Sequence, residues 1–195
     1  NKIFFENINE KGFDKEALKK IKKKKNIRII DATNIKISNL YNVISNFNSL
    51  MLQSPDNKNF TKQNIRIVSK KKPSKQTLNN LIFAFNICRN VKSNAIVLSK
   101  NETTVGIGSG QPSRLDSCKI AIEKMNRFQN INENDEIVAA SDAFFPFIDG
   151  IETLVQSGIS AVIQPSGSIR DKEIIKFANQ TNTILVFSNT RHFKH

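Results

Sequence analysis

The most constraining feature of this 195-residue sequence is a regular alternation of short apolar runs with longer amphipathic stretches. Apolar runs of four or five residues, the length of buried strands, occupy positions 95–98, 137–140, 159–163 and 183–187. Strands that alternate with helices form layered structures, because each helix packs on a face of the sheet. The sequence therefore predicts an α/β fold, a layered and mainly parallel sheet with helices on both faces.

The stretches between the apolar runs carry apolar residues at helical spacing. Ser74 is expected to cap the first of these helices, Gly158 to end the third, and Ser168 with Asp171 to form a capping box for the fourth. A further strand is expected at 65–68, and 95–98 is expected to pair with 104–107 as a hairpin. The predicted helical faces are Leu78, Leu81, Ile82, Phe85 and Cys88; Leu115, Cys118, Ala121, Ile122 and Met125; Ile151, Leu154 and Val155; and Ile174, Ile175 and Phe177.

The first third of the sequence has a weaker pattern. Strands are expected at 3–5 and 27–30, and Asp14 is expected to open a helix between them. Residues 34–64 are rich in Asn and Ser and show no clear period, so they are predicted to be irregular.

Charge and composition leave two readings open. The formal net charge of +13 at pH 7 favours nucleic acid or an anionic ligand as partner. However, the lysines are spread along the chain, which favours solvated surface charge over specific nucleic-acid binding. Cys88 and Cys118 lie at apolar helical positions, as expected of small buried residues in a reducing compartment. His192 and His195 make a poor metal site, and no metal is expected. No apolar run is long enough to cross a membrane, and the first residues do not resemble a signal peptide.

Four segments at predicted strand ends have the composition of ligand loops. Residues 106–110 hold three glycines, which suits close backbone approach to an anion or a plain tight turn. Residues 141–150 place three phenylalanines and a proline between two carboxylates. They suit an aromatic wall for a flat heterocycle, with Asp149 on its polar edge, or phenylalanines packed under a loop whose carboxylates cap a helix. Residues 164–168 suit either ligand binding or the capping of a helix. The tail 188–195 suits either closure over a pocket or a frayed terminus.

These segments resemble a known family. The matching segments are 91–97, 106–111 with Ser113-Arg114, 141–150, 161–165 with 167–171, and 191–195. Together they are similar to the C-terminal part of the AICAR transformylase/IMP cyclohydrolase family. The resemblance is strong from residue 65 onward, which divides the chain into 1–64, continuing from a preceding transformylase half, and 65–195, a C-terminal transformylase subdomain.

The resemblance implies a cytidine-deaminase-like fold and transfer of a formyl group from 10-formyltetrahydrofolate to AICAR, 5-aminoimidazole-4-carboxamide ribonucleotide. Asn94 would lie near the reacting amine as the catalytic contact. Phe144, Arg191 and Phe193 would bind AICAR. The reduced folate would be bound by Leu115, Pro146, Phe147, Asp149 and Ser168.

The resemblance also implies what this sequence lacks. The family's catalytic Lys–His pair belongs to the preceding half, and the paired glycines that the family has ahead of a Leu-Val-Gln stretch are replaced here by 46–53. We therefore expect a cytoplasmic protein that works as a homodimer or with its missing N-terminal half. The alternatives are a non-catalytic folate-binding or assembly module, and a basic nucleic-acid-binding protein on a reused fold.

Overall fold

The computed structural model describes residues 6–35, 41–58, 60–128, 132 and 135–195, and it divides the chain into two units. Unit 1 comprises Asn1–Pro55 and unit 2 comprises Asp56–His195. Unit 2 contains the sheet, the four longer helices and every segment that resembles a ligand loop. The strand expected at residues 3–5 lies outside the described residues.

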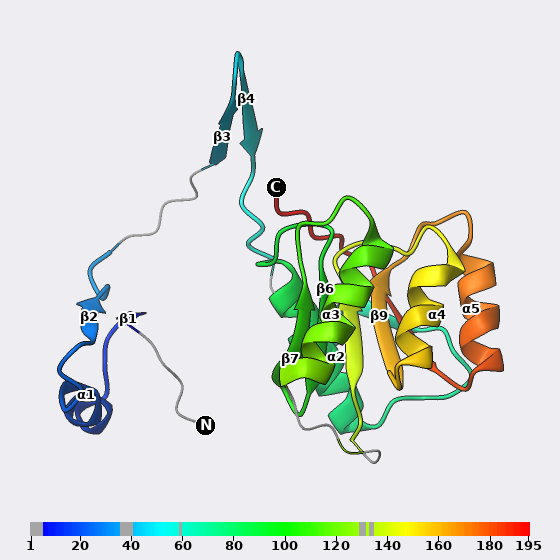
Figure 1. Ribbon diagram of the computed structural model, residues 1–195, viewed down its shortest axis with the longest axis horizontal. Helices are drawn as coiled ribbons and strands as arrows, with labels where there is room; N and C mark the ends of the chain where they lie inside the picture. The colour runs from blue at the N-terminus through cyan, green and yellow to red at the C-terminus, as the bar shows by residue number, and fades with distance from the viewer. Residues whose placement is uncertain (1–5, 36–40, 59, 129–131, 133–134) are drawn as a thin grey trace. The chain divides into compact units, whose positions relative to one another are not determined.

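The core of unit 2 is a six-stranded mixed sheet in the order β5-β10-β9-β8-β6-β7 (Figure 1). Only the β8–β9 and β9–β10 pairings are parallel, so the expectation of a mainly parallel sheet was wrong. The hairpin of β6 and β7 adds two antiparallel pairings at one end, and β5 adds one at the other. The strands are β5 (Ile65–Ile67), β6 (Ile96–Lys100), β7 (Thr103–Gly108), β8 (Val138–Ser141), β9 (Ala161–Pro165) and β10 (Ile184–Ser188).

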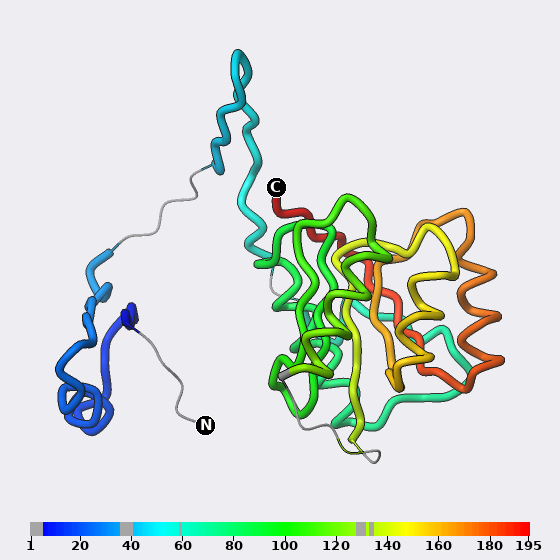
Figure 2. The backbone as a smooth tube through the Cα atoms, viewed as in Figure 1, coloured from blue at the N-terminus to red at the C-terminus, as the bar shows by residue number. Residues whose placement is uncertain are grey.

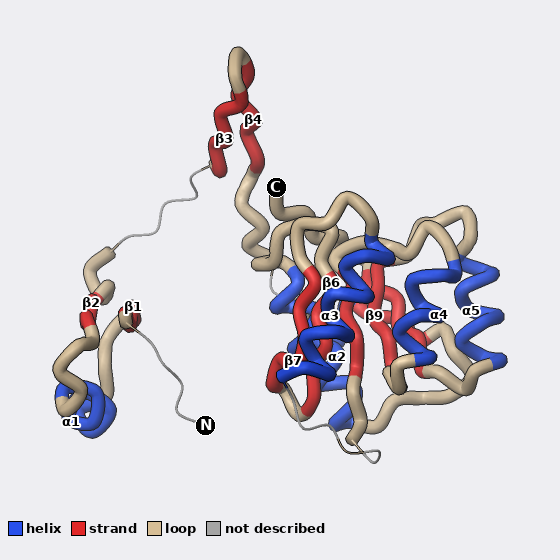
Figure 3. The backbone as a smooth tube through the Cα atoms, in the orientation of Figure 1, coloured by secondary structure: helices blue, strands red, loops and turns tan. Residues whose placement is uncertain are grey.

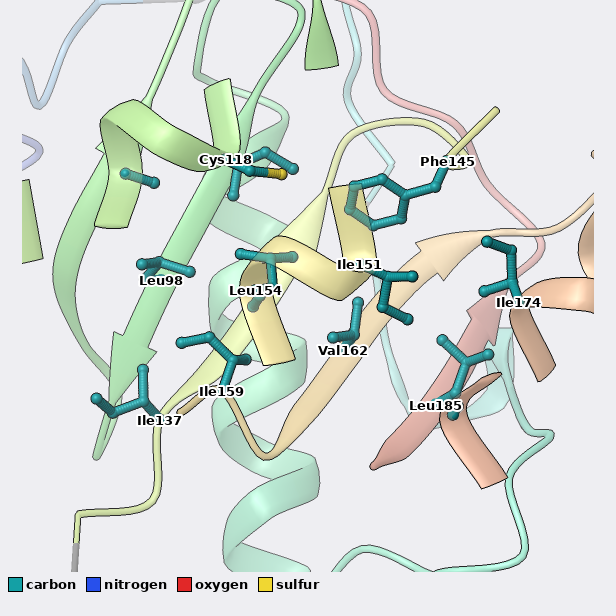
Figure 4. Packing of buried hydrophobic residues seen from close by; sticks show 14 of the residues in the cluster. Leu98, Cys118, Ile137, Phe145, Ile151, Leu154, Ile159, Val162, Ile174 and Leu185 are labelled. Atoms are coloured by element: carbon teal, nitrogen blue, oxygen red, sulfur yellow. The ribbon is translucent and has the colours of Figure 1, made fainter. Parts of the chain in front are cut away.

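Helices cover both faces of this sheet, as predicted (Figures 1 and 3). One face packs against α2, through a cluster that includes Leu81 and Phe85. The other face packs against α3, α4 and α5, where Phe145, Ile151 and Val162 meet in the cluster drawn in Figure 4. Burial of both faces explains why the central strands are apolar over several successive positions rather than at alternate ones. The helices are α2 (Lys75–Cys88), α3 (Arg114–Phe128), α4 (Ile148–Gln156) and α5 (Asp171–Gln180).

The helix ends follow the sequence signals with one exception. The Ser74 hydroxyl accepts a hydrogen bond from the Thr77 amide and caps α2, and Gly158 follows α4 with a φ of 86°. The predicted capping box at α5 is only half formed. The Asp171 carboxylate accepts the amide of Ser168, but α5 begins at Asp171 itself. Ser168 is therefore a residue of the preceding turn, not the N-cap.

Two glycines of the predicted glycine-rich turn belong to strand β7 instead. A Cβ atom on Gly106 would lie 2.1 Å from the carbonyl oxygen of Ala121, and one on Gly108 would lie 1.9 Å from that of Ser117. These glycines let the backbone of α3 lie directly on the strand. Only Gly110, with a φ of 69°, has the turn conformation expected of the segment.

Unit 1 has more regular structure than predicted. Strands β1 (Asn7–Glu10) and β2 (Arg28–Asp31) pair in parallel around α1 (Lys15–Lys22), which Asp14 caps as expected. The segment predicted to be irregular contains an antiparallel hairpin of β3 (Asn42–Asn46) and β4 (Ser49–Gln53). Its apolar side chains are exposed, and this leaves no alternation of buried and exposed positions for a sequence pattern to reveal. Within unit 2, a 3-10 turn, Lys62–Asn64, precedes β5.

Both cysteines are free and buried, as expected from their helical positions. Burial raises the pKa of the Cys118 thiol to about 12, and it raises the pKa of the Cys88 thiol well above the ordinary value. Both thiols therefore act as small apolar side chains of the core at neutral pH.

We predict that Gly108→Ala destabilises the chain by about 2–3 kcal/mol, because the added methyl group would overlap a backbone carbonyl that cannot move without shifting α3. Urea unfolding measures the change. Thr103→Ala, at an exposed position of the same strand, is the control and is expected to stay within about 0.5 kcal/mol of the parent. Equal stability of the two variants would contradict close packing of α3 on β7.

Candidate ligand pocket at the strand ends

Loops at one edge of the sheet of unit 2 enclose a pocket of about 460 Å³. Figure 2 shows these loops and the C-terminus at the same end of the unit. The walls come from the loop before β6, the start of α3, the loop between β8 and α4, and the C-terminal tail. All the site residues expected from the sequence line it except Ser168. They are Asn94, Leu115, Phe144, Pro146, Phe147, Asp149, Arg191 and Phe193.

A buried ion pair lies behind the pocket wall. The Arg114 guanidinium, at the first turn of α3, pairs with the Asp142 carboxylate, which follows β8. Their side chains are only 8% and 1% exposed. Arg114 also donates to the Ser141 hydroxyl at 2.8 Å, and the Ser93 hydroxyl donates to Asp142 at 2.6 Å. Such a pair is held in place by the penalty for leaving either charge buried alone.

The same arginine fixes Asn94. Its second guanidinium nitrogen donates to the Asn94 side-chain oxygen at 2.7 Å. The amide nitrogen of Asn94 donates to the carbonyls of Gln111 at 2.9 Å and Pro112 at 3.0 Å. The backbone carbonyl of Asn94 accepts the Ser117 hydroxyl at 2.8 Å. Asn94 is thus a rigid polar group at the pocket wall, with its orientation set before any ligand arrives.

The three phenylalanines of the aromatic loop differ in how deeply they are buried. Phe145 is 1% exposed, and its ring lies where a Cβ on Gly150 would be, at 2.6 Å from the nearest ring carbon. All three phenylalanines border the pocket, but Phe144 is only partly buried and Phe147 is 53% exposed. Phe145 therefore packs under the loop, as one alternative has it, whereas Phe147 does not; the aromatic wall for a flat heterocycle stays a prediction.

Arginines lie over the rings of Phe144 and Phe147. The Arg191 guanidinium is 4.7 Å from the centre of the Phe144 ring, and that of Arg170 is 4.9 Å from the centre of the Phe147 ring. Cation–π contacts of this kind hold an arginine flat against an aromatic face. The pocket therefore offers flat apolar surfaces bordered by positive charge, which suits a planar ligand that carries polar or anionic groups.

Asp149 and Ser168 take different positions. Asp149 lies in the first turn of α4, where its carboxylate accepts the Gly150 amide at 2.7 Å and keeps an exposed side that lines the pocket. Ser168 lies outside the pocket lining, in the turn before α5. The neighbouring Gly167 lies against the pocket residue Arg191. A Cβ atom on Gly167 would be 2.9 Å from the Arg191 guanidinium.

The tail is an ordered part of the site and is not frayed. The His192 amide donates to the Asp142 carbonyl at 2.9 Å, and the Ser93 amide donates to the Lys194 carbonyl at 2.9 Å. These bonds place Arg191 and Phe193 at the pocket.

Comparison with known proteins places these residues in a family. The sequence matches the AICARFT/IMPCHase bienzyme family over residues 1–124. The chain belongs to this family. Proteins named bifunctional purine biosynthesis protein PurH are similar over the length of the chain. The one from Chlorobium phaeobacteroides is 40% identical over 195 residues, which is 100% of this chain and 37% of that protein. The one from Buchnera aphidicola subsp. Baizongia pistaciae is 44% identical over 194 residues, 98% of this chain and 36% of that protein. The chain thus spans little more than a third of the length of these relatives.

Arg114 is the pocket residue that the sequence analysis did not single out. It was noted only as part of the family motif Ser113-Arg114, yet it lines the pocket and bonds both Asn94 and Asp142. An arginine at a helix start reads as a surface residue, and its partners lie 20 and 28 positions away in sequence. The family motif Ser113-Arg114 is the sequence signal that points to Arg114.

Two features are absent from the described part of the chain. No group of three or more His, Cys, Asp and Glu residues there could hold a metal ion. No helix among the same residues is long and apolar enough to cross a membrane.

We predict that Arg114→Met destabilises the chain by about 3–5 kcal/mol, because it leaves the Asp142 carboxylate buried without its cation. Urea unfolding is the measurement. Glu173→Gln removes an ion pair whose side chains are 46% and 51% exposed, and it is expected to change stability by no more than about 0.5 kcal/mol. Comparable losses in the two variants would refute the buried pair as an anchor.

Proposed function

We propose that this chain forms the C-terminal half of an AICAR formyltransferase, which passes a formyl group from 10-formyltetrahydrofolate to the amino group of AICAR in purine biosynthesis. One observation carries the proposal. Eight residues that the family resemblance assigns to the two substrates, and that are scattered from Asn94 to Phe193, line a single pocket. Family membership and the similarity to purine biosynthesis proteins support the same conclusion.

The nucleotide would bind beside Phe144 and Arg191, which lie in contact at the pocket. Its flat imidazole ring would contact the phenylalanine, its carboxamide would meet the guanidinium, and Phe193 would close the edge. Asn94 would hold the reacting amine, since its side chain is fixed by three hydrogen bonds at the pocket wall. Rigid polar groups of this kind orient a weak nucleophile without losing freedom on binding.

The folate would bind on the side of the pocket formed by Leu115, Pro146 and Phe147. These side chains offer an apolar bed for the pterin ring, and the exposed carboxylate edge of Asp149 can accept hydrogen bonds from the ring's amino and N–H groups. Ser168 lies outside this bed. Under the proposal, contact between Ser168 and the folate would depend on the turn that Ser168 shares with Gly167.

The residues that line this pocket include no histidine or lysine to take the proton from the amine. The sequence contains two histidines, His192 and His195, and the first is buried away from solvent. We propose that the Lys–His pair of the family supplies this step from the preceding half, or from a partner subunit in a homodimer. The setting would be cytoplasmic, where both free thiols stay reduced.

The same observation favours an alternative of a different class. Without that pair, the 195 residues would form a folate-binding or assembly module that turns nothing over. Binding and turnover therefore need to be measured separately.

A calorimetric titration of this chain with tetrahydrofolate at physiological salt tests the proposal. Saturable binding is expected, because the apolar bed and Asp149 lie entirely within unit 2. A folded chain that binds neither tetrahydrofolate nor AICAR would overturn the assignment of the pocket. Binding without formyl transfer on addition of both substrates is the result that the alternative predicts.

We predict that Asp149→Ala weakens tetrahydrofolate binding about 30-fold, equivalent to about 2 kcal/mol, through loss of a charged hydrogen bond to the pterin edge. The titration above gives both dissociation constants. Glu152→Ala, an exposed change three residues further along α4, is the control and should leave affinity unchanged. Unchanged affinity in Asp149→Ala would remove this carboxylate from the folate site.

A further inference from the structure

His192 is the fully buried member of a tail whose neighbours face the pocket. Its relative exposure is 0%, whereas Arg191 and Phe193 on either side line the pocket. The three residues therefore alternate between pocket and interior. Contacts that hold the His192 ring in place also restrict the backbone of Arg191 and Phe193, because one peptide unit joins each of them to His192.

His192 is held by three kinds of contact, two of its ring and one of its backbone. Its Nδ1 atom bonds the Asp56 carboxylate, and its face packs on Phe85 of α2 with ring centres 4.6 Å apart. The backbone amide of His192 donates to Asp142, the residue that pairs with Arg114. Among the described residues, the Nε2 atom has no hydrogen-bond partner. A phenylalanine would pack as well without this buried unpaired nitrogen, so the Asp56 bond is what favours a histidine here.

Asp56 is a firm anchor because its own segment is tied to α2. Phe60 is 4% exposed and packs on Phe85 with ring centres 4.5 Å apart. The Asn86 side chain exchanges hydrogen bonds with the backbone of Phe60, at 3.3 Å and 3.1 Å. The segment that begins at Asp56 thus provides a fixed acceptor for the tail, 136 positions away in sequence.

From these contacts we infer that His192 and Asp56 are a positioning pair, which holds Arg191 and Phe193 against the pocket and so sets its affinity for the nucleotide. Neither residue touches the ligand. The pair acts through the tail: the Nδ1–carboxylate bond keeps the His192 ring inserted, and insertion presents the Arg191 guanidinium to Phe144. The identity of the ligand rests on the proposed function, but the insertion itself does not.

The first test follows the tail without any ligand. Amide hydrogen exchange by NMR is compared for the parent chain, Asp56→Ala and Asp56→Asn. In Asp56→Ala, exchange at the His192 amide is expected to rise on the order of tenfold, while Val186 in the core of β10 stays unchanged. Asp56→Asn keeps an oxygen acceptor and should restore most of the protection. Unchanged exchange at His192 in Asp56→Ala would overturn the inference.

The second test measures nucleotide and folate affinity of the same variants by calorimetry. AICAR binding is expected to weaken on the order of tenfold in Asp56→Ala and in His192→Phe, which keeps the ring packing but not the bond. Tetrahydrofolate binding should change less than about twofold, because its expected wall does not include the tail. Lys194→Met removes the exposed bond from its Nζ to the Asn90 carbonyl and serves as the matched control.

The two tests separate the possible failures. If the parent chain binds no AICAR, the nucleotide assignment fails, and the exchange data still decide whether the pair holds the tail. If AICAR and tetrahydrofolate lose affinity equally in Asp56→Ala, the pair supports the whole fold rather than the tail, and the positioning role is rejected. Loss confined to AICAR, with recovery in Asp56→Asn, supports it.

Discussion

The pocket depends on a single buried charge pair. The carboxylate of Asp142 bonds Arg114 and Ser93. The backbone carbonyl of Asp142 accepts the His192 amide, and its backbone amide donates to the Ala95 carbonyl. One residue after β8 thereby joins the start of α3, the loop before β6 and the C-terminal tail. A buried carboxylate cannot lose its cation without a large penalty, so the four segments keep one arrangement. The aromatic loop continues from this fixed point, which is why its phenylalanines have defined partners.

Much of the fold was predictable because burial imprints a period on the sequence. The strands that are covered on both faces and the helices between them were found near their true bounds. The directions of the strands were not, since an apolar run reads the same in a parallel or an antiparallel pairing. The exposed hairpin of β3 and β4 was missed for the opposite reason: with both faces exposed, burial imposes no alternation. At α5, Ser168 carried the right residue type for a cap, yet the chain turned before the helix began.

The pocket could be predicted from the sequence less well than the fold. Sequence alone could not divide Phe144, Phe145 and Phe147 between core and surface, because the division depends on Gly150 lying under one ring and arginines lying over the others. Those arginines come from distant segments. The family resemblance named most of the lining residues, but it could not show what holds them. Arg114 and His192 act through partners far away in sequence, and such pairings leave no local pattern.

The net charge of the chain also takes on a different meaning in the structure. The lysine clusters at 22–25 and 70–72 are exposed, and such charges are screened beyond a Debye length of about 8 Å at physiological salt. Near the pocket the cations are arginines, held by a carboxylate or an aromatic ring. Arg191 lies among the groups proposed for the nucleotide, and Asp149 among those proposed for the folate. Under the proposed function, a cation toward one ligand and a carboxylate toward the other would orient both by charge. This discrimination would come from a few fixed groups, not from the overall charge of +13.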